Sequence, residues 1–217
     1  PPERDFDWTD SGIEGAYRFA NRLWRLAAEL AGNVPALEAC SASEADAALP
    51  KARELRQKEH ATVKKVGEDI AGRFQFNTAI AAVMELVNLM YLTKDELLAD
   101  AGGRRVLGSA LSTTLALMFP VTPHLCEELR ARLGFASPLV EQLWPVYSEE
   151  ALVRDTVTIV VQVNGKLRGK LEVAADEAED SVKAAALADA NVQKHLEGLT
   201  IRKVVLVPGK LVNVVAN

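Results

Sequence analysis

The stretch Val157–Val173, which reads VTIVVQVNGKLRGKLEV, decides the fold class of this chain. Apolar residues recur at alternate positions before and after Asn164-Gly165, and this period is typical of half-buried strands. An Asn-Gly pair between two such runs is the strongest short signal for a tight turn joining antiparallel strands. The stretch therefore predicts a β-hairpin, so the chain is not helical throughout.

The residues that follow the hairpin extend it into a small α/β domain. The expected elements are a helix over 178–190, a short helical turn near 192–196, and Val-rich strands over 201–207 and 211–215. Pro208-Gly209 supplies the turn between the last two strands. The predicted order is β-β-α-β-β, and the domain is expected to occupy residues 156–217.

The residues before the hairpin have apolar side chains at every third or fourth position, the period of amphipathic helices. Pro120 ends one such run, and Thr122-Pro123 has the composition of a helix start. Helices are expected at about 11–32, 50–71, 74–90, 104–119 and 123–133, the fourth beginning after Gly102-Gly103. The predicted fold is mainly α, with a five-helix bundle at 1–147. A short charged tether at 148–155 should leave the α/β domain mobile.

The segment 74–90 is apolar on nearly every side, which predicts a helix surrounded by others at the centre of the bundle. Its polar residues fall on one stripe, namely Asn77, Thr78, Glu85 and Asn88. Glu85 has no second carboxylate or nucleophile beside it in the pattern. We therefore interpret the stripe as a structural polar network rather than a catalytic site.

The composition excludes several classes of protein. With 217 residues, 49% hydrophobic and 25% charged, the chain has the composition of a globular protein of one large or two modest domains. No run of about 18 apolar residues predicts a membrane span, and we expect a cytoplasmic protein. Cys40 and Cys126 are far apart, which predicts neither a disulfide framework nor a cysteine zinc site. The start at Pro1-Pro2 without Met suggests a piece of a longer polypeptide.

The sequence offers no set of residues suited to catalysis. It contains no Walker-type phosphate loop and no GxGxxG dinucleotide motif. His60, His124 and His195 lie more than 60 residues apart, without companions at metal-binding spacing. Cys126 falls on the apolar side of its helix and is expected to pack in the core. We predict no catalytic, cofactor-binding or metal-ligating residue in this chain.

Basic residues give the clearest functional signal. Lys166, Arg168 and Lys170 alternate along the second hairpin strand, which predicts three cations on one face and Leu167 and Leu171 on the other. Three more cations are expected to join the same rim, namely Arg202, Lys203 and Lys210. Such a cluster suits contacts with RNA phosphates, although an ordinary solvated sheet face would show the same pattern.

A weaker cationic stripe lies on the first predicted helix. Arg18, Arg22 and Arg25 share one helical face by their spacing. The alternative is an ordinary solvent-exposed face. Residues 1–153 carry 16 Lys and Arg against 22 Asp and Glu, so this region needs a local cationic surface to bind RNA.

Several motifs resemble those of a known family. They are FNTAIAAVMELVN at 76–88, FPVTPHLCEEL at 119–129, Trp144-Pro145, VQVNGKLRGK at 161–170 and RKVVLVPGKLVN at 202–213. The first three resemble the helical anticodon-binding-type domain of bacterial leucyl-tRNA synthetases, which are class I enzymes. The last two resemble the small C-terminal domain of the same family. The resemblance covers nearly the whole chain, least securely at 33–58 and 91–104.

The resemblance implies the C-terminal, tRNA-binding fragment of such an enzyme. It would support ATP-dependent attachment of leucine to its tRNA by positioning the tRNA body, elbow and long variable arm. The HIGH-type and KMSKS-type motifs and the editing domain of the family are absent from the sequence. ATP and Mg are therefore expected to bind in the missing catalytic part, and this fragment is expected to be inactive alone.

The same resemblance implies two partners, namely leucine tRNA and the remainder of the parent synthetase. We expect a monomer with no membrane contact. The alternative from another functional class is a structural module, in which the bundle braces the catalytic core and the small domain binds protein without touching RNA.

Overall fold

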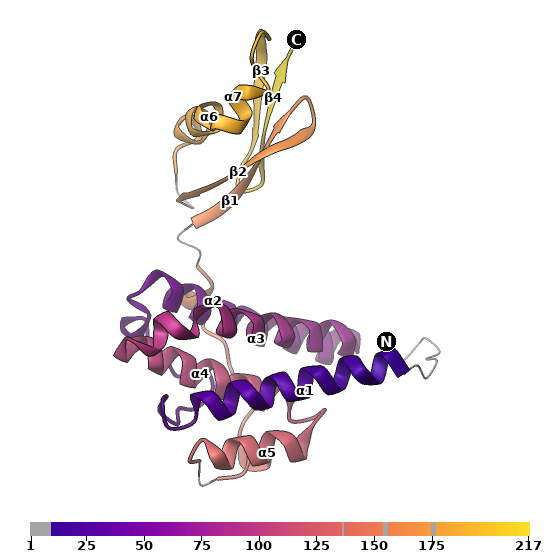
Figure 1. The fold of residues 1–217 in the computed structure, drawn as a ribbon, viewed down its shortest axis with the longest axis vertical. Helices are drawn as coiled ribbons and strands as arrows, with labels where there is room; N and C mark the ends of the chain where they lie inside the picture. Colours follow the sequence, from indigo (N-terminus) through magenta and orange to yellow (C-terminus); the bar gives the residue numbers. More distant parts are fainter. Residues whose placement is uncertain (1–9, 136, 154–155, 175–176) are drawn as a thin grey trace. The chain divides into compact units, whose positions relative to one another are not determined.

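The computed structural model describes residues 10–135, 137–153, 156–174 and 177–217, and the chain divides into two compact units (Figure 1). Unit 1 comprises residues 1–153 and is helical, whereas unit 2 comprises residues 154–217 and contains a four-stranded sheet. The predicted fold class, a five-helix bundle followed by a small α/β domain, is confirmed. Each unit has its own hydrophobic core.

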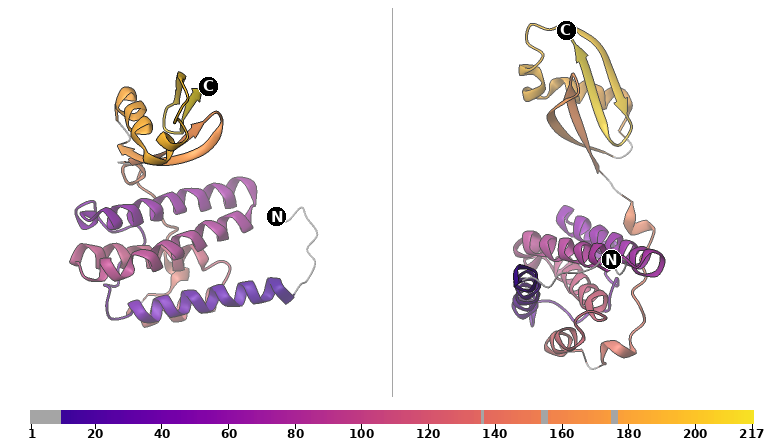
Figure 2. Two further views of the ribbon diagram at one scale, coloured as in Figure 1. Left: turned by 45° about the horizontal axis from the view of Figure 1, so that its top comes forward. Right: turned by 90° about the vertical axis from the view of Figure 1, so that its right-hand side faces the viewer.

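Unit 1 is built from five α-helices within its described residues. They are α1 (Asp10–Leu30), α2 (Pro50–Arg73), α3 (Phe76–Leu98), α4 (Ala101–Met118) and α5 (Pro123–Arg132). Three short 3-10 turns accompany them, η1 (Ala45–Ala47), η2 (Leu139–Glu141) and η3 (Glu150–Leu152). Helices α2, α3 and α4 run antiparallel in succession, and α1 and α5 pack beside them (Figure 2).

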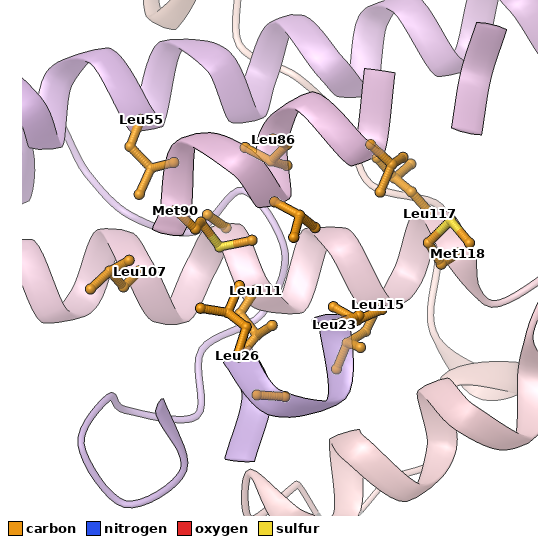
Figure 3. Packing of buried hydrophobic residues seen from close by; sticks show 14 of the residues in the cluster. Leu23, Leu26, Leu55, Leu86, Met90, Leu107, Leu111, Leu115, Leu117 and Met118 are labelled. Carbon is orange, nitrogen blue, oxygen red and sulfur yellow. The ribbon is translucent and has the colours of Figure 1, made fainter. Parts of the chain in front are cut away.

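Helix α4, and not the apolar segment at 74–90, occupies the centre of the bundle, so that prediction is wrong. Thirteen of the 18 residues in α4 are buried. Leucines and a methionine from its neighbours converge on it, namely Leu23, Leu26, Leu55, Leu86 and Met90 around Leu107, Leu111 and Leu115 (Figure 3). Many α4 residues are small, and a Cβ at Gly108 would lie 2.5 Å from the carbonyl oxygen of Pro35. The small side chains of α4 let the neighbouring helices approach closely. A hydropathy pattern does not report side-chain size, so it does not identify α4 as the central helix.

Helix α3 extends to Leu98, beyond the predicted end at residue 90, and the pair Gly102-Gly103 lies inside α4 rather than before it. The turn is made by Asp100, whose carboxylate accepts a hydrogen bond from the Gly103 amide at 2.7 Å. A Cβ at Gly103 would lie 2.5 Å from the carbonyl oxygen of Leu97. The glycine therefore permits the close approach of two helix ends instead of breaking a helix.

The polar residues of α3 do not form one network. Glu85 is exposed and pairs with Lys58 of α2, with 2.5 Å between Oε2 and Nζ, whereas the Thr78 hydroxyl donates to Asp69 at 2.6 Å. Among the described helices, α3 is the one long and apolar enough to cross a membrane by composition. Core helices of soluble proteins pass the same test, and eight α3 residues are buried within unit 1.

Unit 2 contains β1 (Thr156–Val163), β2 (Lys166–Ala174), α6 (Glu179–Ala188), α7 (Ala190–Lys194), β3 (Ile201–Val207) and β4 (Leu211–Ala216). The strand order is β2-β1-β4-β3, with β1 and β4 parallel and the other pairs antiparallel. Asp189 separates α6 from α7, because its carboxylate accepts from the amides of Asn191 and Val192 and caps α7. The short helical turn predicted near 192–196 corresponds to α7, which begins two residues earlier. Helices α6 and α7 cover one face of the sheet (Figure 2).

Part of the predicted tether is held against α2. The backbone amide of Ser148 donates to Nδ1 of His60 at 3.1 Å, and the side-chain amide of Gln57 donates to the carbonyl oxygen of Val153 at 2.9 Å. Lys64 pairs with Glu149 at 3.4 Å. We name residues 147–153 the junction strap. Residues 154 and 155 of the predicted tether lie outside the described residues.

Candidate nucleic-acid interface

The hairpin tip in unit 2 is tied to the last strand. Asn164 and Gly165 both have positive φ, 50° and 78°, as the tight turn requires. The Asn164 side chain donates to the carbonyl oxygen of Ala216 at 2.8 Å and accepts from the Ala216 amide at 3.0 Å. The Gly165 amide donates to the side chain of Asn213 at 3.1 Å. These bonds fix the position of Lys166, the first residue after the turn.

The predicted stripe of Lys166, Arg168 and Lys170 does not lie on one face. Val161 pairs with Gly169 but Gln162 pairs with Leu167, so Arg168 is an extra residue in a β-bulge. Residues directly opposite each other share a face, and Lys166 stands opposite Val163, whose side chain is buried towards the helices. Lys170 stands opposite Val160 on the other face.

The same bulge overturns the predicted places of the leucines. A Cβ on Gly169 would lie 3.4 Å from Val192 of α7, so this position faces the helices, and Leu171 shares its face. Leu167, in contrast, pairs with Gln162 and is 55% exposed. The single extra residue therefore moves Leu167 to the face that α6 and α7 leave open.

A second irregularity separates the cations of β3. Ile201 pairs with Ala216 and Lys203 with Val215, so Arg202 is also an extra residue. Its Nε donates to the side chain of Asn217 at 2.6 Å. Lys203 shares the uncovered face with Val215, and Lys210 lies in the turn before β4, where Gly209 has φ of 66°. The six predicted cations are thus distributed over both faces and the turns.

The face of the sheet without helices brings Lys170 and Lys203 together with apolar residues. Its exposed members are Leu167, Val205, Val207 and Val215. The two lysines stand on the outer strands, and three strand spacings place their strands about 14 Å apart. This apolar face was not predicted from the sequence. Its signal was the nearly continuous Val-rich composition of 204–207 and 212–215, because strands with both faces apolar lack simple alternation.

In unit 1, the weaker predicted stripe forms part of an open groove of about 460 Å³. It is lined by Tyr17, Arg18, Asn21, Arg22, Arg25 and Tyr91. The Arg22 guanidinium lies 4.7 Å from the centre of the Tyr91 ring, and the Tyr91 hydroxyl donates to the Arg22 carbonyl oxygen at 2.8 Å. Arginines and aromatic rings that line a surface groove suit phosphates and base faces. The tyrosines were missed because they lie far apart in sequence.

The buried polar residues of unit 1 described next hold its elements together or pack in its core. Glu59 Oε1 accepts from the Cys40 amide, Ser109 and Thr113 at 3.0, 2.8 and 2.6 Å, which ties the 31–49 connection to α2 and α4. Burial raises the pKa of the Cys40 thiol to about 12 and that of Cys126 to about 11, which makes both poor nucleophiles at neutral pH. In the described part of the chain, no three His, Cys, Asp or Glu residues gather closely enough to hold a metal ion.

Residues 52–184 match the family model of the anticodon-binding domain of tRNA ligase, a region that runs from α2 into α6. Leucine–tRNA ligase of Nitratidesulfovibrio vulgaris (strain DSM 19637 / Miyazaki F) is 62% identical over 99% of this chain and 26% of its own length. The enzyme of Pseudomonas paraeruginosa is 45% identical over 100% of this chain and 24% of its own length.

Among solved structures, the chain resembles the LeuRS of Agrobacterium radiobacter K84, crystallised as a ternary complex with tRNA and LeuAMS. The TM-score is 0.80 with 27% identity, and the match covers 98% of this chain and 27% of that one. The chain therefore spans about a quarter of the length of the relatives it matches.

Proposed function

The chain belongs to the family of the anticodon-binding domains of tRNA ligases, and we propose that it is the tRNA-binding C-terminal region of a leucine–tRNA ligase. The observation that carries the proposal is that similarity to leucine–tRNA ligases extends over 99% of the chain, including unit 2. The tRNA in the crystallised A. radiobacter complex, whose protein shares 27% identity with this chain, supports the same role.

We propose that unit 2 contacts the elbow and long variable arm of the tRNA, and that unit 1 lies along the tRNA body. Structured RNA is recognised mainly through shape, ribose and phosphate, which suits separated cations better than a set of base-reading side chains. Lys170 and Lys203 act on the uncovered sheet face. Lys166, Arg168, Arg202 and Lys210 act from the hairpin tip, the two bulges and the β3–β4 turn. The groove of Arg18, Arg22 and Arg25 supplies a second contact.

In this proposal the parent enzyme attaches leucine to tRNA at the expense of ATP. ATP, Mg and leucine are handled by the remainder of the ligase, and this region has no aminoacylation activity alone. Its partners are leucine tRNA and that remainder, in the cytoplasm, with the ligase acting as a monomer. The alternative, in which the region only braces the enzyme, differs in one respect. It predicts no direct contact with RNA.

The decisive experiment compares binding of this chain to a leucine tRNA and to a tRNA with a short variable loop, each at two salt concentrations. We expect tighter, salt-sensitive binding to the long-armed tRNA. The double variant Lys170→Ala/Lys203→Ala should bind several-fold more weakly and lower the salt slope by about 0.7 to 0.9 per lost phosphate contact.

Lys183→Ala is the matched control, because Lys183 lies on α6 and pairs with Asp180 at 3.3 Å. It removes the same kind of charge from the helices that cover the other face of the sheet, so binding should remain unchanged. Equal loss in the control and the double variant would indicate a nonspecific charge effect. Absence of binding by the unmodified chain would favour the bracing role.

A further inference from the structure

The two border strands of the sheet in unit 2 differ in how their outer sides are closed. The strand order β2-β1-β4-β3 leaves β2 and β3 with one neighbouring strand each (Figure 2). On β2, the bulge at Arg168 interrupts the ladder, and the Asn191 side chain donates to the Arg168 carbonyl oxygen at 2.6 Å. Bulges and covering contacts of this kind keep a border strand from pairing with another chain. The outer side of β2 is therefore partly closed.

The outer side of β3 is regular from Lys203 to Val207. The bulge at Arg202 lies before these residues, which pair with β4 without interruption. They include neither Pro nor Gly, so no residue in the run weakens or blocks strand pairing. We name residues 203–207 the β3 edge.

Val204 and Leu206 carry the outward backbone groups of the β3 edge. Val204 stands opposite Val214, whose carbonyl oxygen accepts from the Asn164 amide on the β1 side. Because the bonds of Val214 run towards β1, the N–H and C=O of Val204 point away from β4, and those of Leu206, two residues on, do the same. In the described part of the chain, no helix or loop donates to these groups or accepts from them. The β3 edge thus offers donors and acceptors at the spacing of a strand.

The side chains beside the β3 edge favour an acidic partner. Residues 198–217 contain three charged side chains, Arg202, Lys203 and Lys210, and no Asp or Glu. On the uncovered face, Lys203 stands in line with the exposed side chains of Val205 and Val207. A strand added beside β3 would place its own side chains alternately on the two faces of the sheet. Apolar residues would then pack against the valines, and acidic residues would lie near the cations.

We propose that the β3 edge binds an extended acidic polypeptide, which adds a strand to the sheet. The main chain of this polypeptide pairs with Val204 and Leu206, as in other cases of recognition by strand addition. A nucleic-acid backbone lacks alternating N–H and C=O groups at strand spacing, so the edge favours a polypeptide over RNA. The inference does not rest on the proposed function, because pairing along the β3 edge requires no contact with tRNA.

The test is binding of this chain to two short synthetic peptides, one with alternating Val and Glu and one with alternating Val and Lys. We expect the acidic peptide to bind at least tenfold more tightly than the basic one. Hydrogen exchange measured by NMR should show that it slows exchange at the Val204 and Leu206 amides. Methylation of the peptide nitrogens that face β3 should weaken binding at least tenfold, and this comparison leaves the protein itself unchanged.

A pair of variants tests the same backbone contact from the side of the protein. Val204→Pro removes an outward N–H but keeps the bonds between β3 and β4, because proline is tolerated where the N–H of a border strand faces away from the sheet. Val204→Ala is the matched control, since it shortens the same side chain and retains the N–H. Binding of the acidic peptide should fall at least tenfold in the first variant and remain within about twofold in the second.

Equal binding of the acidic and basic peptides, or undiminished binding of the methylated peptide, would overturn the proposal. Exchange at the Val204 and Leu206 amides that slows with the concentration of this chain alone would indicate a second copy as the occupant. Exchange that slows with leucine tRNA but not with the acidic peptide would indicate RNA. Either result would also overturn it. Peptide binding requires no tRNA, so failure of the proposed function would be detected separately.

Discussion

Glu59 and His60 are adjacent in α2, and burial shifts their pKa values in opposite directions. Burial raises the pKa of Glu59 from 4.5 to about 6, against hydrogen bonds from Thr113, Ser109 and Cys40 that lower it. Burial lowers the pKa of His60 from 6.5 to about 4. The folded chain therefore holds a proton on Glu59 more tightly than the unfolded chain does, and one on His60 less tightly.

These shifts predict two opposing effects of acid on stability. As pH falls from 6.5 towards 4, the unfolded chain takes up the His60 proton first, so the contribution of His60 to stability is lost. As pH falls from 6 to 4.5, the folded chain takes up the Glu59 proton first, so stability is regained. Between pH 7 and 4.5 each effect is on the order of 2 kcal/mol.

The variants His60→Gln and Glu59→Gln should separate the two effects. His60→Gln should lose less unfolding free energy than the unmodified chain between pH 7 and 4.5, by roughly 2 kcal/mol. Glu59→Gln should lose more, by a similar amount. Urea unfolding at several pH values measures both. Parallel pH profiles for all three proteins would show that neither group titrates as its burial implies.

A pair of glycine substitutions tests the close packing at the α3–α4 turn. Gly103→Ala would place a Cβ 2.5 Å from a backbone oxygen, and we expect a loss of about 2 kcal/mol from overpacking. Gly67→Ala, inside α2, meets nothing within 4 Å and should stabilise the chain by about 0.5 to 1 kcal/mol. Thermal unfolding of the two variants checks the opposite signs. Destabilisation by both variants would mean that the free space around a glycine does not decide the effect of the substitution.

At the scale of elements, the sequence predicted helices and strands well but misplaced side chains wherever one extra residue decided the outcome. The run KLRGKLEV alternates regularly, yet the bulge at Arg168 moves Leu167 to the open face. Gly169 was the available signal, because glycine inside a strand often marks a bulge. Similarly, α4 is central because its residues are small, and a hydropathy pattern favours the larger side chains of α3.

The junction strap could not be predicted, because its contacts join residues about 90 positions apart. The hydrogen bonds from Gln57 to Val153 and from Ser148 to His60 depend on how the strap crosses α2. In sequence, residues 148–153 have the composition of a charged linker. Long-range contacts of this kind leave no local pattern, so the length of the free tether was overestimated.

Removing the α2 side chains that hold the strap should loosen it. In Gln57→Ala/Lys64→Ala, we expect the Ser148 amide to exchange its hydrogen faster, because two of the supports around its bond to His60 are gone. Lys51→Ala is the control, since it removes an exposed ion pair with Glu96 that does not touch the strap. Hydrogen exchange measured by NMR gives the rates. Unchanged exchange in the double variant would mean that His60 and buried Ala151 hold the strap by themselves.

At the scale of the whole molecule, the two units have separate cores. The core of unit 1 is made by residues between Leu23 and Leu139, whereas that of unit 2 is made by residues between Ile159 and Val214. No residue that the structure describes belongs to both cores. Cooperative unfolding follows shared packing, so two cores without common members should unfold as two transitions. Separate cores would allow unit 2 to bind tRNA, as proposed, without depending on the packing of the bundle.

Core substitutions in each unit test this independence. Leu107→Ala empties part of the centre of unit 1 and should cost about 3 kcal/mol, and Val161→Ala should cost unit 2 about 2 kcal/mol. Calorimetry should show the first variant lowering only one transition temperature and the second lowering only the other. If either substitution shifted both transitions equally, the units would be coupled in folding. The tRNA contact proposed for unit 2 would then depend on the bundle as well as on the sheet.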